Sequence, residues 1–338
     1  MRTPSTDRSE TTTTRMAGWA IERFGDPQRN PALLVLETLR MPKVGRRDVL
    51  IRMYGAEIGD WDALVASGGW SVERSFPIVL GLAGSGSVVA VGKDVVGLRE
   101  GDRVYTYNHP LAHEGCASHD HNGAWAQYML VPFERVALAP TSLDLTHAGA
   151  VPIVGLTAHE AVVDLLKVER HDVLLVTAAA GGVGHLAVQI AAQRGARVVA
   201  TARAQNHELL RGLGAELLID YTREDLVKEV RKRFPDGADK ALNGVEGDTA
   251  NEVVRAVRSR GHVVDLTGSA TENLPDGRVD IDYVVRPDRA RLMTLATMFD
   301  RGELKLEVAH RVPFANAPRG LGEVMTKQVR GVLVLGIK

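Results

Sequence analysis

Hydrophobic positions in residues 16 to about 150 form short apolar runs that Gly, Pro and Asp interrupt. Such runs occur at 32–39, 48–54, 84–91 and 103–107, and β-branched residues are frequent in them. Runs of this length bounded by turn residues are typical of β-strands. The segment VVAVGKDVVGLREGDRVY adds two glycine-centred turns between β-branched runs. This part of the chain is therefore expected to form a compact β-barrel domain.

From 151 to 285 the pattern changes to alternating strands and helices. The run 172–178, DVLLVTA, is continuously apolar, as in a strand buried on both faces of a parallel sheet. The next segment, 183–195, has apolar residues at helical spacing and ends in glycine. Further strand-like and helix-like segments alternate up to HVVDLTG. A doubly wound parallel sheet is the usual outcome of this order, so the fold class is α/β.

The two ends of the chain differ from these domains. Residues 1–15 are polar and Thr-rich, so we expect a disordered tail without a secretory signal. Residues 286–338 hold one more helix and the closing apolar run VLVLGIK. A strand this apolar must be paired, and we expect segment 286–338 to return to the first domain.

Composition narrows the class of protein. A length of 338 residues suggests about two domains. With 41 basic and 42 acidic side chains, the net charge of −1 gives no electrostatic signature of nucleic-acid or membrane-surface binding. The sequence has no uninterrupted apolar stretch of about 18 residues. A single cysteine, Cys116, excludes internal disulfides and four-thiolate zinc sites, which favours a cytoplasmic location.

A glycine turn follows the apolar strand directly and opens a helix. The turn contains Ala180, Gly181, Gly182, Val183 and Gly184. Gly181 and Gly182 are expected to let the backbone turn sharply near a pyrophosphate, and Gly184 to let the helix pack closely on the strand. The helix N-terminus would then offer free N–H groups to the phosphates. A purely structural turn is the alternative interpretation.

The next strand end indicates which dinucleotide is bound. NAD sites usually carry an acid about 20 residues beyond the glycines, but RVVATA ends without one and Arg203 follows. A guanidinium can hold a 2′-phosphate, and Tyr221 can add a hydroxyl from the neighbouring strand. NADPH is therefore the predicted cofactor. The alternative is that Arg203 is an ordinary solvated residue.

Several motifs, in one order, resemble the medium-chain dehydrogenase/reductase superfamily and its zinc-independent quinone oxidoreductase branch. They are FPIVLGLAGSGSVVAVGKDVVGLREGDRVY, GAWAQYMLVP, AGAVPIVGLTAHEAVVD, LLVTAAAGGVGHLAVQIAAQRGARVVATA, LGAELLIDY and VRPDRARLMTLATMFDRGEL. The resemblance implies a GroES-like barrel domain, a Rossmann domain inserted within it, and a cofactor cleft between them. It also implies a homodimer formed by edge strands of the Rossmann sheets.

The chain departs from its zinc-containing relatives at the metal. Their catalytic cysteine matches Gly59, and their Gly-His-Glu motif matches Gly81, Leu82 and Ala83. Leu and Ala cannot ligate zinc, so no catalytic metal is expected. Quinone reductases often have an Asn and a Tyr beside the nicotinamide. The matching positions here are Gly59 and Leu64, with Trp70 at another usual Tyr, and these substitutions put a direct transfer of those roles in doubt.

The resemblance also implies residues near the nicotinamide. Thr157 matches a family residue beside the ring, and further matching positions border the cofactor: Gly268, Tyr283, Val284 and Val285. The source of the proton is left open between Tyr54, Asp60, His159 and solvent. For each of these three side chains, a structural role is the alternative.

Without a metal, the acceptor must be reducible with little electrophilic help. A quinone or an α,β-unsaturated carbonyl meets this condition, because hydride can add while charge spreads onto oxygen. NADPH-dependent reduction of such a substrate is the leading hypothesis. The alternatives are a non-enzymatic NADPH-binding structural or regulatory protein, and an enoyl-thioester reductase of polyketide or fatty-acid assembly.

The loop 108–123 is rich in histidine. It contains His109, His113, Cys116, His119 and His121, where zinc-containing relatives carry a structural lobe. Imidazole and thiolate are good zinc ligands, but the spacing matches no established site. A loop at the surface or the pocket edge is the default interpretation, and metal binding is the alternative.

Overall fold

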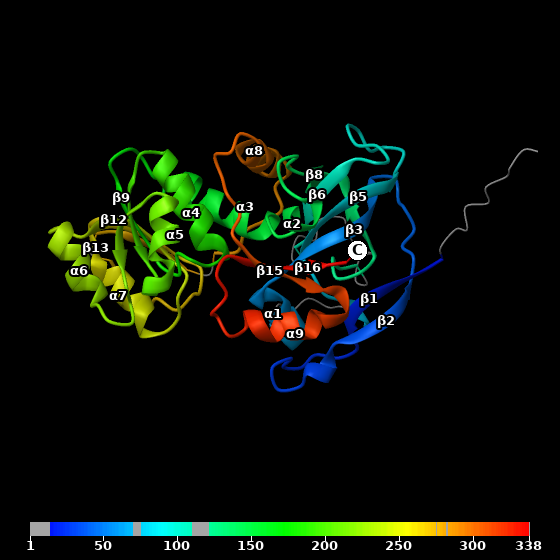
Figure 1. Ribbon diagram of the computed structural model, residues 1–338, viewed down its shortest axis with the longest axis horizontal. Helices are drawn as coiled ribbons and strands as arrows, with labels where there is room; N and C mark the ends of the chain where they lie inside the picture. Colours follow the sequence, from blue (N-terminus) through cyan, green and yellow to red (C-terminus); the bar gives the residue numbers. More distant parts are fainter. Residues whose placement is uncertain (1–13, 70–75, 110–121, 275, 282, 338) are drawn as a thin grey trace, which may run out of the picture.

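A computed structural model describes residues 14–69, 76–109, 122–274, 276–281 and 283–337. The chain forms two units, one built on a parallel sheet and the other on antiparallel strands (Figure 1). We call them the dinucleotide unit and the catalytic unit. Among the described residues, none of the helices is long and apolar enough to cross a membrane.

The catalytic unit contains two sheets. One has the order β2-β1-β4, and the other β15-β16-β3-β5-β6-β8, with β7 also paired to β3. The strands are β1 (Arg15–Ile21), β2 (Val35–Arg40), β3 (Asp48–Ile58), β4 (Ile78–Val79), β5 (Ala83–Val91), β6 (Arg103–Tyr107), β7 (Tyr128–Pro132), β8 (Val136–Leu138), β15 (Val308–Pro313) and β16 (Val332–Gly336).

The dinucleotide unit is one parallel sheet of order β11-β10-β9-β12-β13-β14. Its strands are β9 (Val173–Val176), β10 (Arg197–Thr201), β11 (Ala215–Ile219), β12 (Ala238–Asn243), β13 (Val257–Asp265) and β14 (Arg278–Ile281). The order reverses beside β9, and ligands of such sheets bind at the carboxyl ends of the strands near the reversal. The predicted parallel sheet is confirmed.

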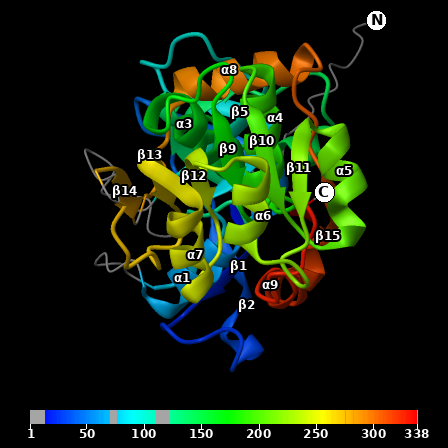
Figure 2. The same ribbon diagram turned by 90° about the vertical axis from the view of Figure 1, so that its left-hand side faces the viewer.

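Helices cover both faces of this sheet (Figure 2). Leu174 of β9 belongs to the apolar cluster that includes α4, whereas Leu175 belongs to the cluster of α6 and α7. The unbroken run VLLV is therefore needed, because each face of the strand is buried. The helices of this unit are α4 (Gly182–Gln193), α5 (His207–Gly212), α6 (Leu226–Arg233) and α7 (Asp248–Ala256).

Other helices join or flank the two units. α3 packs against α4 and α8, and α1 packs against α9. Their bounds are α1 (Asp60–Ser67), α2 (Leu145–Ala148), α3 (Pro152–Glu160), α8 (Arg289–Asp300) and α9 (Ala317–Val324). Shorter turns are η1 (Pro31–Leu33), η2 (Phe133–Arg135), η3 (Ala161–Leu165), η4 (Ala204–Asn206) and η5 (Phe314–Asn316).

The C-terminal strand returns to the catalytic unit. β16 pairs antiparallel with β3, with Leu333 opposite Ile58, and parallel with β15. All five residues of β16 are buried, so its apolar sequence is satisfied inside a sheet. The pairing expected for this run is confirmed.

Candidate active site

The glycine turn lies between the end of β9 and the start of α4. A Cβ on Gly184 would lie 2.4 Å from the Ala178 carbonyl oxygen, which is a backbone atom that cannot move away cheaply. A Cβ on Gly182 would lie 2.9 Å from Val154 Cγ1 of α3. Gly184 therefore permits close packing of helix and strand, as predicted, and Gly182 permits the approach of α3.

The sharp bend is not where the sequence suggested. Gly181 has φ −83° and ψ −176°, which any residue can adopt, and Ala178 takes the left-handed conformation at φ 47°. The backbone dihedral angles therefore do not require glycine at position 181. What the missing side chain provides is free space beside the backbone. A Cβ built there would have only the Ala178 oxygen, at 3.2 Å, within 4 Å. The backbone is thus open to a closely approaching phosphate group at the N-terminus of α4.

A buried polar network supports the turn from below. Asn243 lies between Thr177 and Asp265, accepting from the Thr177 hydroxyl at 2.8 Å and donating to the Asp265 carboxylate at 2.8 Å. Asp265 also accepts from the backbone N–H groups of Thr267 and Ala270, at 3.0 and 2.7 Å. The network joins the carboxyl ends of β9, β12 and β13, where a fully satisfied polar cluster rigidifies the site. This network was not predicted from the sequence, although a polar residue closes each apolar run.

Arg203 and Tyr221 follow the carboxyl ends of two neighbouring strands. β10 and β11 pair with Thr201 opposite Ile219, so the two residues lie on adjacent strand ends. Both side chains are exposed, Tyr221 to 51%. The nearby Asp220 carboxylate is engaged by the Thr222 backbone N–H at 3.0 Å and by the Thr222 hydroxyl at 2.7 Å. A guanidinium and a phenol are therefore available to a ligand at this edge.

Of the residues expected near a nicotinamide, Val285 contacts the catalytic unit, and Thr157 lies on α3, which contacts both units. The backbone oxygen of Val285 accepts a hydrogen bond from the Tyr107 hydroxyl of β6, at 3.1 Å. Thr157 is buried on α3, Gly268 has φ 66° after β13, and Val284 is 41% exposed. Burial and the Glu160 carboxylate raise the pKa of Tyr283.

The position that matches the zinc-binding cysteine is filled by an aromatic ring. A Cβ on Gly59 would lie 2.0 Å from Cε2 of Trp61. The Trp61 indole N–H is buried without a hydrogen-bond partner. Leu82 and Ala83 are both buried apolar residues. None of these side chains is a ligand for a metal: one is an aromatic ring and the other two are buried apolar groups.

Two buried carboxyl groups, of Glu57 and Asp62, lie next to Gly59, and their burial is not visible in the local sequence pattern. Asp62 accepts backbone hydrogen bonds from Gly59 at 3.0 Å and Gly81 at 3.1 Å, and burial raises its pKa to about 7. Glu57 accepts from the Ile153 backbone at the start of α3, but its Oε2 atom has no partner. Burial, and then the Asp62 and Asp60 charges, raise the pKa of Glu57 well above its usual range.

The three proposed proton donors occupy different settings. Tyr54 is half-buried at an irregularity of β3, and Asp60 is exposed at the first residue of α1. His159 lies in the last turn of α3, and burial and the Arg291 charge lower its pKa. Its Nδ1 atom is buried without a hydrogen-bond partner. Tyr54 and Asp60 thus belong to the β3–α1 corner, whereas His159 lies close to charged residues such as Arg291 of α8.

The histidine loop is described only at its edges. His113, Cys116, His119 and His121 lie outside the described residues, as does Trp70. His109 is buried and meets Tyr107 edge-to-face, with ring centroids 5.7 Å apart. Within the described ranges, no group of three or more His, Cys, Asp or Glu side chains could hold a metal ion.

A parallel sheet with a glycine turn after its central strand, joined to a unit of mainly antiparallel strands, is the architecture of two-domain nicotinamide-dependent dehydrogenases and reductases. Two protein families match the chain: "Alcohol dehydrogenase GroES-like domain" over residues 45–141, and "Zinc-binding dehydrogenase" over residues 182–300. Each match falls on one of the two units.

Individual relatives agree with these matches. The chain is 32% identical to a 2-methylene-furan-3-one reductase of Solanum lycopersicum, covering 89% of this chain and 73% of the relative. It is 31% identical to a chloroplastic NADPH-dependent alkenal/one oxidoreductase of Arabidopsis thaliana, covering 88% and 73%. The quinone oxidoreductase structure from Coxiella burnetii superposes with a TM-score of 0.82 at 26% identity, covering 96% and 100%.

The chain belongs to the medium-chain dehydrogenase/reductase superfamily, in its quinone oxidoreductase-like branch. It is an oxidoreductase, and the resemblance seen in the sequence is confirmed.

Proposed function

We propose that this protein uses NADPH to reduce a quinone or the activated C=C bond of an α,β-unsaturated carbonyl compound, without a catalytic zinc. One observation carries the proposal. In an otherwise complete fold of this family, the metal-ligand positions hold Gly59, Leu82 and Ala83, and Trp61 fills the space at Gly59. The similarity to a 2-methylene-furan-3-one reductase and to an NADPH-dependent alkenal/one oxidoreductase supports it.

Bound NADPH would supply the hydride. The open backbone at Gly181 and the N-terminus of α4 would hold its pyrophosphate, and Thr157, Gly268 and the segment 283–285 would border the nicotinamide. Trp61 would give a flat conjugated substrate an apolar surface to lie against. Ordering the two reactants in this way and excluding water would be the main contributions of the protein to the rate.

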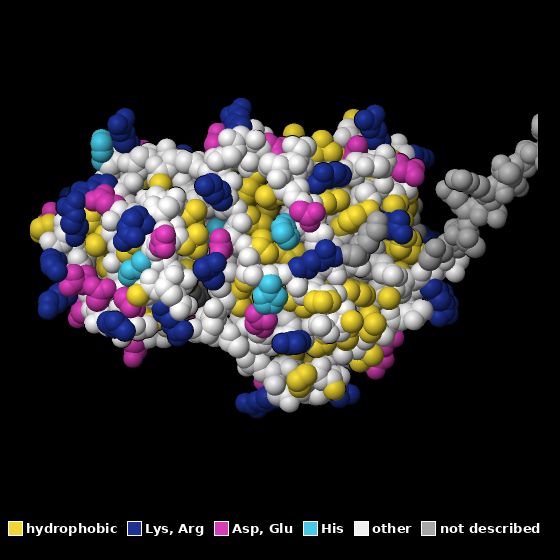
Figure 3. Space-filling model, in the orientation of Figure 1, with side chains coloured by type: hydrophobic (Ala, Val, Ile, Leu, Met, Phe, Trp, Pro, Cys, Tyr) yellow, Lys and Arg dark blue, Asp and Glu magenta, His cyan; other side chains and the backbone are white. Residues whose placement is uncertain are grey.

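The choice of NADPH rests on Arg203 and Tyr221. Both are exposed at adjacent strand ends, where the 2′-phosphate of the adenosine would lie. On the face in Figure 3, basic and acidic side chains are intermingled over the dinucleotide unit. A preference for NADPH is therefore better explained by the single side chain of Arg203 than by an overall positive charge of this unit.

A homodimer formed by edge strands of the Rossmann sheets is also proposed, with β14 as one such edge. Light scattering would test it, because a monomeric mass contradicts the proposal.

The cytoplasm remains the expected location, since one cysteine leaves nothing that requires an oxidising compartment.

The function is tested by following NADPH consumption against quinones, enones, 2-alkenals and enoyl thioesters. We expect turnover with a quinone or enone, and slower turnover with NADH. Turnover confined to enoyl thioesters would favour a role in fatty-acid or polyketide assembly. Tight NADPH binding without turnover of any acceptor would favour a non-enzymatic binding protein.

A further inference from the structure

A closed ring of hydrogen bonds joins the glycine turn to the segments that run back to the catalytic unit. Gly331 donates to the Ala180 carbonyl at 2.7 Å, and Val332 donates to the Glu307 carbonyl at 2.9 Å. Glu307 donates its backbone N–H to Nε2 of His185 at 3.2 Å. Nδ1 of His185 lies 2.9 Å from the Gly181 carbonyl, which closes the ring.

His185 is the one member that takes part through its side chain, and both ring nitrogens are used. A carbonyl can only accept and a backbone N–H can only donate, so Nδ1 carries the proton and Nε2 accepts. The imidazole must therefore be neutral. It is fully buried, and burial lowers its pKa, which keeps it neutral.

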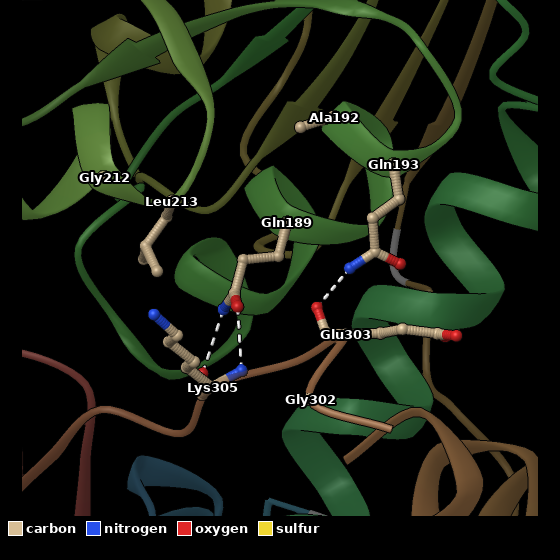
Figure 4. Close-up of a pocket in the computed structure, with 8 residues that line it drawn as sticks. All are labelled: Gln189, Ala192, Gln193, Gly212, Leu213, Gly302, Glu303 and Lys305. Atoms are coloured by element: carbon tan, nitrogen blue, oxygen red, sulfur yellow. Dashed lines mark hydrogen bonds between the residues drawn. The ribbon is translucent and has the colours of Figure 1, made fainter. Parts of the chain in front are cut away.

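Two further side chains of α4 extend this contact away from the turn. Gln189 donates to the Lys305 carbonyl at 2.9 Å and accepts from its N–H at 2.8 Å, and Gln193 donates to the Glu303 carbonyl (Figure 4). Four helical residues rise about 6 Å and two extended residues about 6.6 Å. Side chains four residues apart on α4 can therefore each reach a backbone group on the segment 303–307, where the contacted groups are two residues apart. Of the three, His185 is the one whose side chain also binds the glycine turn.

We propose that His185 is a positioning residue for the cofactor: by binding both Gly181 and Glu307, it fixes the phosphate-binding turn relative to the catalytic unit. This inference rests on the proposed function, because it concerns the same dinucleotide site. The N–H groups at the start of α4 must point at the pyrophosphate while the nicotinamide lies against the other unit. A shift of the turn would weaken the binding of NADPH and misplace its reactive carbon relative to the substrate.

His185→Leu tests this role, with Gln189→Leu as the matched control. Both variants remove side-chain bonds between α4 and the same segment, but Gln189 lies one helical turn further from the glycines. We expect His185→Leu to raise the NADPH dissociation constant about tenfold, as the loss of one or two hydrogen bonds would do. Its kcat with a quinone or enone should also fall. Gln189→Leu should lose stability yet keep its NADPH affinity within about twofold.

The outcomes separate the two proposals. If the unsubstituted protein does not bind NADPH in a fluorescence titration, the proposed function fails. If it binds NADPH and both variants bind it equally well, His185 is merely structural and the inference is overturned. Should His185→Leu not fold, His185→Asn replaces it, since its amide can still donate toward Gly181 but is too short for Glu307. An NADPH affinity equal to that of the unsubstituted protein would then contradict the inference.

Discussion

The indole of Trp61 lies against the α-carbon of Gly59, so that a Cβ at position 59 would fall 2.0 Å from Cε2 of the ring. Zinc-containing members of the superfamily carry a metal ligand at the position of Gly59. Here the glycine leaves room for the aromatic side chain two residues further on. The ring thus occupies the space that a side chain at position 59 would need.

Gly59→Ala should displace Trp61. The backbone at Gly59 is extended, with φ −126°, so the added methyl group strains contacts and not the backbone. We expect a destabilisation of about 1–3 kcal/mol, a changed tryptophan emission and a raised KM for the quinone or enone. NADPH affinity should change little, because α4 and its turn are untouched.

A double-mutant cycle isolates this contact. Trp61→Leu removes the ring, so Gly59→Ala should cost less in the Trp61→Leu background than in the unsubstituted protein. Equal costs in both backgrounds would mean that the ring does not occupy this space in solution.

Gly184→Ala should damage the dinucleotide site directly. The methyl group would lie 2.4 Å from the Ala178 oxygen and 2.6 Å from Cα of Ala179. The methyl group should push α4 away from β9. We expect this to lower the free energy of unfolding by roughly 1–3 kcal/mol or more and to weaken the binding of NADPH. The control is Gly212→Ala, where no heavy atom lies within 4 Å of the added Cβ. Thermal unfolding and NADPH titration of both variants make the comparison, and equal effects would contradict the close packing.

Glu57 predicts a pH dependence of stability. Its pKa is raised in the folded protein, so the folded state keeps this proton at pH values where the unfolded chain has lost it. The free energy of unfolding must then fall as pH rises above the ordinary carboxyl value of 4.5. Glu57→Gln removes the titration. We expect the variant to match the unsubstituted protein near pH 4 and to be the more stable of the two at pH 8.

Thermal unfolding at several pH values measures this difference. Glu100→Gln, at an exposed position, is the control for the loss of one acidic charge. A stability difference between Glu57→Gln and the unsubstituted protein that stays constant from pH 4 to 8 would show that Glu57 is not held protonated.

Local patterns were enough to predict the two units and the glycine turn. Strand β9 is apolar on both faces because helices cover both, and that arrangement is visible as an uninterrupted run. β13 was less visible. It begins at Val257, within the polar stretch VRSRG, where an ion pair of 2.6 Å joins Arg258 to Asp239 of the neighbouring strand. Strand pairing there depends on a partner that the local sequence does not show.

The site was predicted less completely for the same reason. Residues proposed for cofactor binding from local motifs, such as Gly184 and Arg203, can be found by reading along the chain. The burial of Glu57 and the contact of His185 with Glu307 depend on segments far apart in the sequence, 122 residues in the second case.

Arg203→Glu should convert the cofactor preference. Under the proposed function, the exposed Arg203 guanidinium would make charge-assisted hydrogen bonds to the 2′-phosphate of NADPH, each worth about 1.5–3 kcal/mol. Its replacement by a carboxylate adds repulsion, so the NADPH dissociation constant should rise roughly 10- to 100-fold or more. NADH lacks the phosphate, and a carboxylate near this position can accept from its 2′-hydroxyl. NADH affinity should therefore be unchanged or improved.

Arg170→Glu is the matched control for this prediction. Arg170 is also exposed and belongs to the same unit, but it precedes β9 and so lies at the amino ends of the strands, opposite the glycine turn. The two variants change the net charge of the protein equally, so a general electrostatic effect would weaken NADPH binding in both. A specific contact weakens it in Arg203→Glu alone, and fluorescence titration with NADPH and NADH measures the difference. Unchanged NADPH binding in Arg203→Glu would remove the argument for NADPH, and the phosphate would then have to be held elsewhere along the ends of β10 and β11.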